Sequence, residues 1–539
     1  MRSVALAVAV ALLVGCAEPG EAQRPPTAAP SPGQLADTDQ ATPTQTAPGL
    51  PTAQEWQWAR SLTHRMTLRQ LAGQVIVVAW TGDRSPVEQV RRLHFGGVIT
   101  LPGGRVSPTR AAEVNQEVRR SFGQRGYPPF LAVDQEGGRV VRVGTPVPQL
   151  PSLMAAGAVD RPRLTRLAAY ESASGLRRAG FTVVLAPVVD LTVGPRDPVI
   201  GTRSAGSTPS LAIPHVIAAG EGIRRAGLVP VVKHFPGHGS VAADSHHRLP
   251  VQRASLKRLQ RRDLAPFRAA IEAGFPAIMT GHLAVRAVEP EQPATTSRRV
   301  ITGLLREEMK FSGLVVTDAL NMAGVQRAHP GATAAVRALD AGADVVLMPP
   351  NPRMTRDRIV KAVRRGWLSQ SRLQDAATTM IATLMHARPT RLAGGKGAAD
   401  RLARGAITSL AGPCRGPLVG DRVRIAGSDW VSVHMSVELA RRGVDVVPRP
   451  DRKQRLRRWR AVPLISLDGY GSALRRRAAV AVALDRPWPL GRVKARVKVA
   501  TFGATEASLR ALADVLTGRA QARGRLPVHM AGVERHGCH

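Results

Sequence analysis

The chain has 539 residues, of which 44% are hydrophobic and 21% charged, and its formal net charge is +37. This length allows two folded domains with large cores, and the hydrophobic share is that of a globular protein. A basic surface attracts nucleic acids, anionic lipids and acidic wall polymers. However, arginines occur in every segment, and only nine phenylalanines and three tyrosines are available to stack on bases. We therefore expect a solvated basic surface and no specific nucleic-acid binding.

The N-terminus predicts an export signal. The apolar run 4–14 is too short to cross a bilayer as a mature helix, and it ends in LVGC, which resembles the lipobox of bacterial lipoproteins. Residues 1–16 are thus expected to be a signal peptide whose Cys16 is lipidated; the alternative is a chance cysteine in an ordinary signal. The protein would then be lipid-anchored at the outer face of the bacterial cytoplasmic membrane, or released into the cell envelope. Residues 17–50, rich in Pro, Thr, Ala and Gln, predict a disordered linker.

The other two cysteines, Cys414 and Cys538, are too few for a disulfide scaffold, and no CxxC pair suggests structural zinc. A bridge between these two cysteines is compatible with an exported protein. The sequence leaves that bridge open.

Eight Val- and Ile-rich runs between residues 75 and 349 alternate with segments of helical spacing, such as residues 255–274. This pattern predicts an α/β fold with a (β/α)8 TIM-type barrel over residues 51–390. The runs are residues 75–80, 96–100, 130–138, 181–191, 229–239, 276–285, 313–322 and 343–349.

The C-terminal part predicts a second, smaller domain. Residues 391–400 look like a linker, and residues 401–539 contain short apolar runs and one expected helix, residues 507–518. We expect a short αβα-type domain there.

Polar residues follow the apolar runs of the barrel. The alternative is that strands simply end in polar loop residues. However, the opposite ends of the runs have mostly Gly, Pro and small apolar residues, which favours a functional explanation. Barrels of this kind have their active sites at the C-terminal ends of the strands. The residues are Asp134, Asp190, Lys233, His234, His282 and Asp318.

The stretch KHFPGHGSVAADSHHRLP, residues 233–250, concentrates titratable side chains. His234 and His238 are four residues apart, but Pro and Gly between them prevent the helix that would give this spacing its meaning in a metal site. We therefore expect no metal there. Gly237 and Gly239 are expected to make the loop mobile.

Asp244 and His246 lie two residues apart in the same stretch, so both side chains project to one side of an extended or turn segment. The carboxylate can then fix the tautomer of the imidazole and raise its basicity, which suits a proton donor near neutral pH. Asp318 ends the seventh run with an apolar segment before it, where a carboxylate could act as nucleophile or electrostatic stabiliser.

Five motifs together resemble glycoside hydrolase family 3, in its bacterial β-N-acetylglucosaminidase branch. The resemblance covers about residues 55–390, and residues 500–528 are similar to the end of that family's C-terminal αβα domain. The motifs are KHFPGHG (233–239), DSH (244–246), TDALNM (317–322), DQEGGRV (134–140) and GTRS (201–204).

The resemblance implies a retaining mechanism with Asp318 as nucleophile and His246, assisted by Asp244, as general acid/base. It also implies that four residues contact the sugar, namely Asp134, Arg203, Lys233 and His234. His282 is a weaker candidate for lining the sugar site, with packing as the alternative. Neither a metal nor an organic cofactor is required.

The expected activity is exo-hydrolysis of terminal β-N-acetylglucosamine (GlcNAc) from peptidoglycan fragments or other glycoconjugates, by a protein expected to be monomeric. One alternative is a β-GlcNAc phosphorylase that uses the same residues. A non-catalytic sugar-binding lipoprotein and a polyanion binder are alternatives from other classes. The C-terminal domain looks shorter than the full sandwich of larger family members, so its role stays open.

Overall fold

The computed structural model describes residues 49–538 apart from residues 83, 449–458, 470–472, 532 and 534–536. The predicted signal peptide, Cys16 and nearly all of the predicted linker 17–50 lie outside the described residues. Residues 44–539 form one compact unit. Within the described part of the chain, none of the helices combines the length and the apolar character needed to cross a membrane.

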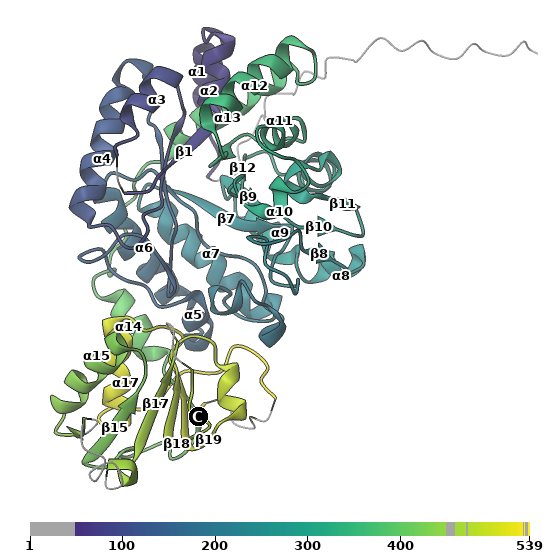
Figure 1. Cartoon of the computed structure of the whole chain (residues 1–539). Helices are drawn as coiled ribbons and strands as arrows, with labels where there is room; N and C mark the ends of the chain where they lie inside the picture. Colours follow the sequence, from purple (N-terminus) through teal and green to yellow (C-terminus); the bar gives the residue numbers. More distant parts are fainter. Residues whose placement is uncertain are drawn as a thin grey trace, which may run out of the picture. The chain divides into compact units, whose positions relative to one another are not determined.

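Eight parallel strands form the barrel sheet (Figure 1), in the order β12-β9-β7-β6-β3-β2-β1-β13. A bridge between Val316 and Val345 brings the two ends of this order together. Each strand falls within one of the eight predicted runs, which confirms the predicted barrel. The strands are β1 (Ile76–Trp80), β2 (Gly97–Thr100), β3 (Phe130–Val133), β6 (Val183–Val184), β7 (Val229–Phe235), β9 (Ala277–Thr280), β12 (Leu314–Thr317) and β13 (Val346–Leu347).

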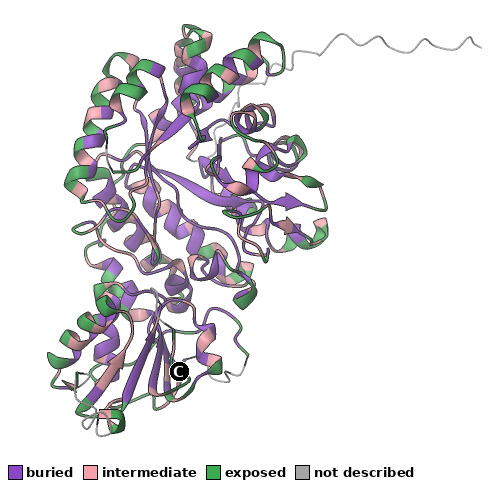
Figure 2. Ribbon diagram, viewed as in Figure 1, coloured by how far each residue is buried: buried purple, intermediate pink, exposed green. Residues whose placement is uncertain are grey.

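The strands are buried on both faces, whereas the surrounding helices expose their outer sides (Figure 2). Alternate residues on β7 show the two environments: Val231 belongs to the apolar cluster that fills the barrel, and Val232 belongs to a cluster shared with the outer helices. Because the side-chain period of a strand is two, Lys233 projects to the same side as Val231, at the end of the strand. The strand thus delivers a charged group to the barrel mouth.

Helices cover the barrel between successive strands. The main ones are α1 (Ala53–His64), α2 (Leu68–Gln74), α3 (Val87–Leu93), α4 (Pro108–Ser121), α5 (Leu153–Val159), α6 (Pro162–Arg178), α7 (Pro209–Arg225), α10 (Ala323–Gln326), α11 (Thr333–Asp340), α12 (Pro352–Arg364) and α13 (Gln370–His386), with a π-helical turn segment at Arg299–Glu308.

The predicted helical segment 255–274 contains two helices, α8 (Leu256–Arg261) and α9 (Ala265–Glu272). Pro266 explains the break, because proline has no N–H and its ring would clash with the carbonyl group of Arg262 in a continuous helix. Near the start of α9, the same proline is well tolerated.

Segments of the loops at the barrel mouth form two small sheets. One consists of β8 (Val251–Gln252), β10 (Ala284–Val285) and β11 (Glu289–Pro293), and the other is the hairpin of β4 (Gln135–Gly137) and β5 (Val140–Val141). The first sheet ties the segment after the 240–249 loop to the segment after β9. The second fixes the chain that follows β3.

The C-terminal domain has a six-stranded sheet in the order β14-β19-β18-β17-β15-β16, in which only the β14–β19 pair is antiparallel. The apolar runs expected in this region coincide with its strands, and the expected helix 507–518 with α17. Its elements are β14 (Thr408–Ala411), β15 (Arg422–Ala426), β16 (Asp445–Val446), β17 (Leu464–Asp468), β18 (Arg477–Ala483), β19 (Lys494–Ala500), α14 (Ala398–Gly405), α15 (Asp429–Ala440) and α17 (Glu506–Leu516).

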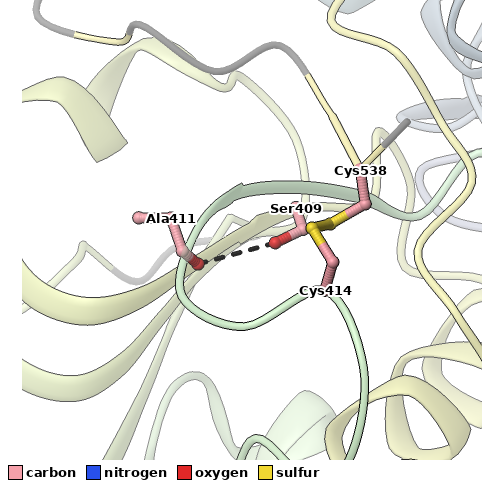
Figure 3. Close-up of a disulfide and its surroundings, with 4 residues drawn as sticks. All are labelled: Ser409, Ala411, Cys414 and Cys538. Carbon is pink, nitrogen blue, oxygen red and sulfur yellow. Dashed lines mark hydrogen bonds between the residues drawn. A yellow bond between two sulfur atoms is a disulfide. The ribbon is translucent and has the colours of Figure 1, made fainter.

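Cys414 and Cys538 form a disulfide with a Cα–Cα distance of 5.5 Å (Figure 3). The bond lies next to the end of β14, where the Ser409 hydroxyl is 3.5 Å from the Ala411 carbonyl oxygen. The structure therefore contains the Cys414–Cys538 disulfide that the sequence left open.

Candidate active site

A buried ion network joins the ends of β3 and β7. The Lys233 ammonium donates to Asp134 Oδ1 at 2.6 Å and lies 2.6 Å from Glu136 Oε1. Burial alone would lower the pKa of Lys233, but the two carboxylates raise it above the ordinary value. Lys233 is therefore a fixed cation at the barrel mouth.

Arg203 reaches this network from the loop after β6. Its Nε and Nη2 atoms donate to the two oxygens of Glu136 at 2.7 and 2.8 Å, which is a bidentate pair. Burial would raise the pKa of Glu136, but Arg203 and Lys233 hold it well below its usual range. Glu136 thus orients both cations, while Asp134 and Arg203 each keep part of their side chain open to solvent.

Asp190, which is buried at the end of the fourth predicted run, organises the first half of the KHFPGHG motif. One carboxylate oxygen lies 2.7 Å from His234 Nδ1, and the other accepts a bond from the His238 backbone N–H at 2.7 Å. Burial would raise the pKa of Asp190, but His234 and His238 lower it. Because the carboxylate can only accept, His234 donates through Nδ1, and its Nε2 faces Arg203 Nη2 at 3.4 Å.

Asp318 lies directly after β12. Its backbone N–H donates to the Thr280 carbonyl at 3.0 Å, and its Oδ1 accepts a bond from the Ala319 N–H at 2.8 Å. Burial would raise the pKa of Asp318, but His282 and His234 lower it below the ordinary value. Asp318 is therefore ionised at neutral pH, and Oδ2 has no hydrogen-bond partner among the described residues.

His282 is fully buried behind Asp318. Its Nε2 lies 2.9 Å from the Ala319 carbonyl oxygen, and its Nδ1 lies 2.9 Å from the Thr295 hydroxyl. A carbonyl only accepts, so Nε2 is the protonated nitrogen, and burial lowers the pKa of the imidazole. Both nitrogens are thus engaged within the protein, and the predicted sugar contact by His282 stays a prediction.

The structure brings Asp244 and His246 together as predicted from their spacing. His246 Nδ1 lies 2.6 Å from Asp244 Oδ1, which also accepts a bond from the His246 backbone N–H at 2.8 Å. The side chains are 59% and 31% exposed for His246 and Asp244, respectively. Burial would raise the pKa of Asp244, but its bonds to His246 lower it, so that a carboxylate faces the imidazole. His246 Nε2 has no partner among the described residues.

Ser245, between these two residues, holds the 240–249 loop against the segment that follows β12. Its hydroxyl lies 2.9 Å from His238 Nε2, and its carbonyl oxygen accepts a bond from the Gly324 N–H at 3.0 Å. The loop is therefore docked on α10, six residues after the candidate nucleophile.

Gly237 and Gly239 have a packing role, while the expected loop mobility stays a prediction. Gly237 has φ +120°, and a Cβ there would lie 2.8 Å from Asp263 Cβ; a Cβ on Gly239 would lie 2.3 Å from the Leu191 carbonyl oxygen. Both glycines are buried. They allow close backbone packing beneath the loop, and the exposed part of the loop begins at residue 242.

Sequence reasoning did not include Glu136 among the site residues, and it named Asp190 only as a strand-end residue at the barrel mouth without a specific role, although both orient other side chains of the site. For Glu136 a signal was present, because it lies two residues after Asp134 and so shares its side of an extended segment. For Asp190 the signal was its place at a strand end. Among the described residues, no cluster of three or more His, Cys, Asp or Glu side chains has the arrangement of a metal site.

Comparison with known proteins is consistent with this geometry. A model of the glycosyl hydrolase family 3 N-terminal domain matches residues 67–383. A β-hexosaminidase of Thiobacillus denitrificans is 36% identical over 284 residues, which is 51% of this chain and 77% of the relative. β-Hexosaminidase LpqI of Mycobacterium tuberculosis is 30% identical over 395 residues, 71% of this chain and 97% of the relative. The structure of a family 3 β-N-acetylglucosaminidase from a Paenibacillus species has a TM-score of 0.76 at 28% identity, covering 86% of this chain and 99% of that one.

The barrel and these relatives define the protein as a glycoside hydrolase of the β-N-acetylhexosaminidase type. The chain belongs to glycosyl hydrolase family 3, in the bacterial β-hexosaminidase branch. The resemblance that the five motifs indicated is therefore confirmed.

Proposed function

We propose that the protein is a retaining exo-β-N-acetylglucosaminidase, with Asp318 as nucleophile and the Asp244–His246 pair as general acid/base. The observation that carries the proposal is the docking of the 240–249 loop on Gly324, six residues after Asp318. This contact supports the assignment of an ionised carboxylate and a carboxylate-oriented imidazole to one site. The paired cations and acids around Lys233 form its polar wall.

This polar wall suits the non-reducing sugar. Asp134 can accept bonds from adjacent hydroxyls with the oxygen that Lys233 does not hold, and Arg203 offers a rigid donor fork. Asp190 holds His234 with Nε2 turned toward Arg203. The Nε2 edge of the imidazole is therefore available to a sugar hydroxyl or to the N-acetyl group. These four residues are proposed to bind the sugar, and His282 is proposed to position Asp318 through the Ala319 carbonyl.

In the first step, Asp318 Oδ2 attacks the anomeric carbon of the sugar. The bond from this carbon to the glycosidic oxygen breaks, the electron pair stays on that oxygen, and the protonated His246 supplies a proton from Nε2. The products are a glycosyl ester on Asp318, a free alcohol and a neutral His246. Asp244 stays ionised throughout and stabilises the imidazolium before the transfer.

In the second step, neutral His246 takes a proton from water as the water oxygen attacks the anomeric carbon. The ester bond to Asp318 breaks, and its electron pair returns to the carboxylate. Two inversions leave the β-configuration unchanged. The separation rule for two catalytic carboxylates does not apply to this pair, because the acid/base is an imidazole.

The proposed natural substrates are β-GlcNAc-terminated peptidoglycan fragments or related glycoconjugates. The support is the predicted export signal with Cys16 in its lipobox, which would hold a monomeric enzyme at the outer face of the cytoplasmic membrane, where wall fragments occur. Labelling with a radioactive or clickable fatty acid would test the anchor. Incorporation that Cys16→Ala abolishes would support it.

Replacement of Asp318 tests the catalytic assignment. Asp318→Ala should abolish chromophore release from an aryl N-acetyl-β-glucosaminide, whereas Asp421→Asn, at an exposed site of the C-terminal domain, should not. His246→Ala with azide should yield the β-glycosyl azide, because azide attacks the covalent intermediate without needing a base. Unchanged turnover by Asp318→Ala would remove the assignment.

A β-GlcNAc phosphorylase is the second candidate, because an imidazole repels phosphate far less than a carboxylate acid/base would. A panel of aryl β-glycosides with GlcNAc, glucose or xylose, in water and in phosphate, separates the two reactions. GlcNAc-1-phosphate as the main product at millimolar phosphate would favour the phosphorylase. A sugar-binding protein without catalysis would release no chromophore in either condition.

A further inference from the structure

We propose that Asp485, from the C-terminal domain, is a positioning residue for sugar binding, because it ties together the two barrel loops that bear the sugar contacts. This inference rests on the proposed sugar-binding roles of Asp134 and Arg203. It assigns the C-terminal domain a part in substrate recognition that the sequence left open.

Asp485 contacts both loops through its two carboxylate oxygens. Oδ1 accepts a bond from the Thr202 hydroxyl at 2.5 Å, and Oδ2 accepts one from Arg139 Nη1 at 3.2 Å. Thr202 immediately precedes Arg203, and Arg139 follows Glu136 by three residues. One carboxylate therefore joins the loop after β6 to the β4–β5 hairpin. The same two segments also contact each other through the Glu136–Arg203 pair.

The environment of Asp485 makes the two bonds unequal. Asp485 is 8% exposed and Thr202 is buried, so their bond is shielded from water. The Arg139 side chain is largely exposed, and an exposed ion pair contributes little. The Thr202 bond should therefore dominate the positioning effect.

Neighbouring residues of the C-terminal domain hold the same loop. Arg486 Nη2 donates to the Pro198 carbonyl at 2.6 Å, and a Cβ placed on Gly201 would lie 3.1 Å from Arg486 Nε. The buried Trp488 lies beside Gly194, where a Cβ would be 3.5 Å from the indole nitrogen. The loop that delivers Arg203 thus rests on the C-terminal domain along residues 194–202.

Within the loop itself, Asp197 accepts bonds from the backbone N–H groups of residues 199, 200 and 201. This internal turn fixes the local shape of the loop. It does not fix where the loop lies relative to the β4–β5 hairpin, which the Glu136–Arg203 pair and Asp485 set together. Loss of Asp485 is thus expected to displace Arg203 without unfolding its turn.

Asp468 offsets part of the stability effect of removing Asp485. Burial and the charge of Asp485 raise the pKa of Asp468 to about 6, which indicates repulsion between the two carboxylates. Removal of Asp485 loses two bonds but also relieves this repulsion. The net effect on stability is therefore expected to be smaller than the loss of two bonds alone.

The test measures GlcNAc binding by calorimetry and aryl-GlcNAc hydrolysis for Asp485→Ala, Asp485→Asn, Thr202→Val and the Thr202→Val/Asp485→Ala double variant. Asp485→Ala should raise KM and the GlcNAc Kd about 10-fold with kcat changed less, because a displaced binding group weakens the grip on the sugar. Asp485→Asn keeps an acceptor for Thr202 and should restore most of the affinity. Asp421→Asn, in the same domain, is the control.

The double variant should be no worse than Asp485→Ala, because Thr202→Val removes the Thr202–Asp485 bond that Asp485→Ala has already removed. Unchanged KM and Kd in Asp485→Ala, or additive losses in the double variant, would overturn the inference. If Asp485→Ala fails to fold, the KM and Kd of Thr202→Val and Asp485→Asn test the inference in its place. The calorimetric Kd separates this result from the proposed reaction, because it reports sugar binding whichever bond the enzyme cleaves.

Discussion

Gly324→Ala tests whether docking of the 240–249 loop controls catalysis. Gly324 lies in α10 with a helical backbone, so alanine is compatible with its conformation and even favours a helix by about 1 kcal/mol. The difficulty is space, because the new Cβ would lie 2.7 Å from the Ser245 carbonyl oxygen and 3.3 Å from His282 Cβ. The buried imidazole behind the residue leaves little freedom to yield, so Ser245 must move.

The size of this movement sets the expected loss. The Ser245 oxygen must retreat by about 0.7 Å to reach ordinary van der Waals distance from the Cβ, which also strains its 3.0 Å bond to the Gly324 N–H. His246 is the next residue and should shift by a similar amount. Since a misplacement of about 1 Å can cost about 100-fold in rate, we expect kcat/KM to fall about 10- to 100-fold.

Two aryl substrates make the assay specific for proton donation. A 4-methylumbelliferyl leaving group needs more protonation than a 2,4-dinitrophenyl group, so its kcat/KM should fall further. Gly303→Ala is the matched control, because a Cβ there meets no atom within 4 Å. Wild-type kcat/KM on both substrates by folded Gly324→Ala would refute the proposed link between docking and catalysis.

Three other predictions concern stability. Lys233→Met leaves the largely buried Glu136 and the partly exposed Asp134 short of a cation and should lower the free energy of unfolding by about 3 kcal/mol in urea titrations, whereas exposed Lys257→Met should not. Burial lowers the pKa of His238 from 6.5 to about 4. Between these pH values the unfolded chain therefore binds more protons than the folded protein. The contribution of neutral His238 to the stability of the fold is complete above pH 6.5 and is lost as the pH falls toward 4. His238→Gln should therefore reduce the loss of stability between pH 7 and pH 4 by about 3 kcal/mol, and an unchanged slope of stability against pH would contradict the assignment. Cys414→Ala removes a cross-link to Cys538 across 124 residues, and the chain-entropy model predicts that such a cross-link contributes about 5 kcal/mol to stability. Calorimetry should therefore show a lower Tm for the C-terminal domain of the variant. Added reductant should lower the Tm of the wild type in the same way but leave the Tm of the variant unchanged.

The barrel could be predicted because each strand is a short, continuous apolar run, which needs no knowledge of distant contacts. The break between α8 and α9 was also present in the sequence, at Pro266, but helical spacing on both sides concealed it. Tertiary contacts determined the rest. Gly237 and Gly239 look like hinge residues in isolation, and only the approach of Asp263 and Leu191 shows that they are needed for packing.

The candidate site shows the same division. The Asp244–His246 contact is local, and its two-residue spacing was sufficient to predict it. Support of the site is non-local: Ser245 meets a glycine 79 positions along the chain, and Thr202 meets an aspartate 283 positions away. Such pairs leave no periodic signal in one sequence, and neither does a disulfide between cysteines 124 residues apart.

The β12–β13 junction differs from the other contacts between neighbouring barrel strands. It has a single isolated bridge, and the buried Asp344 carboxylate completes it by accepting bonds from the Val315 N–H and from Arg306, both at 2.8 Å. The Asp344 carboxylate, which also binds Arg372, thus adds side-chain bonds to the backbone bonds of this junction, such as that from the Thr317 N–H to the Val345 carbonyl at 3.0 Å. Heating or an Asp344→Asn exchange should part the barrel first along the strand that ends in the nucleophile, so that inactivation precedes the loss of helical circular dichroism.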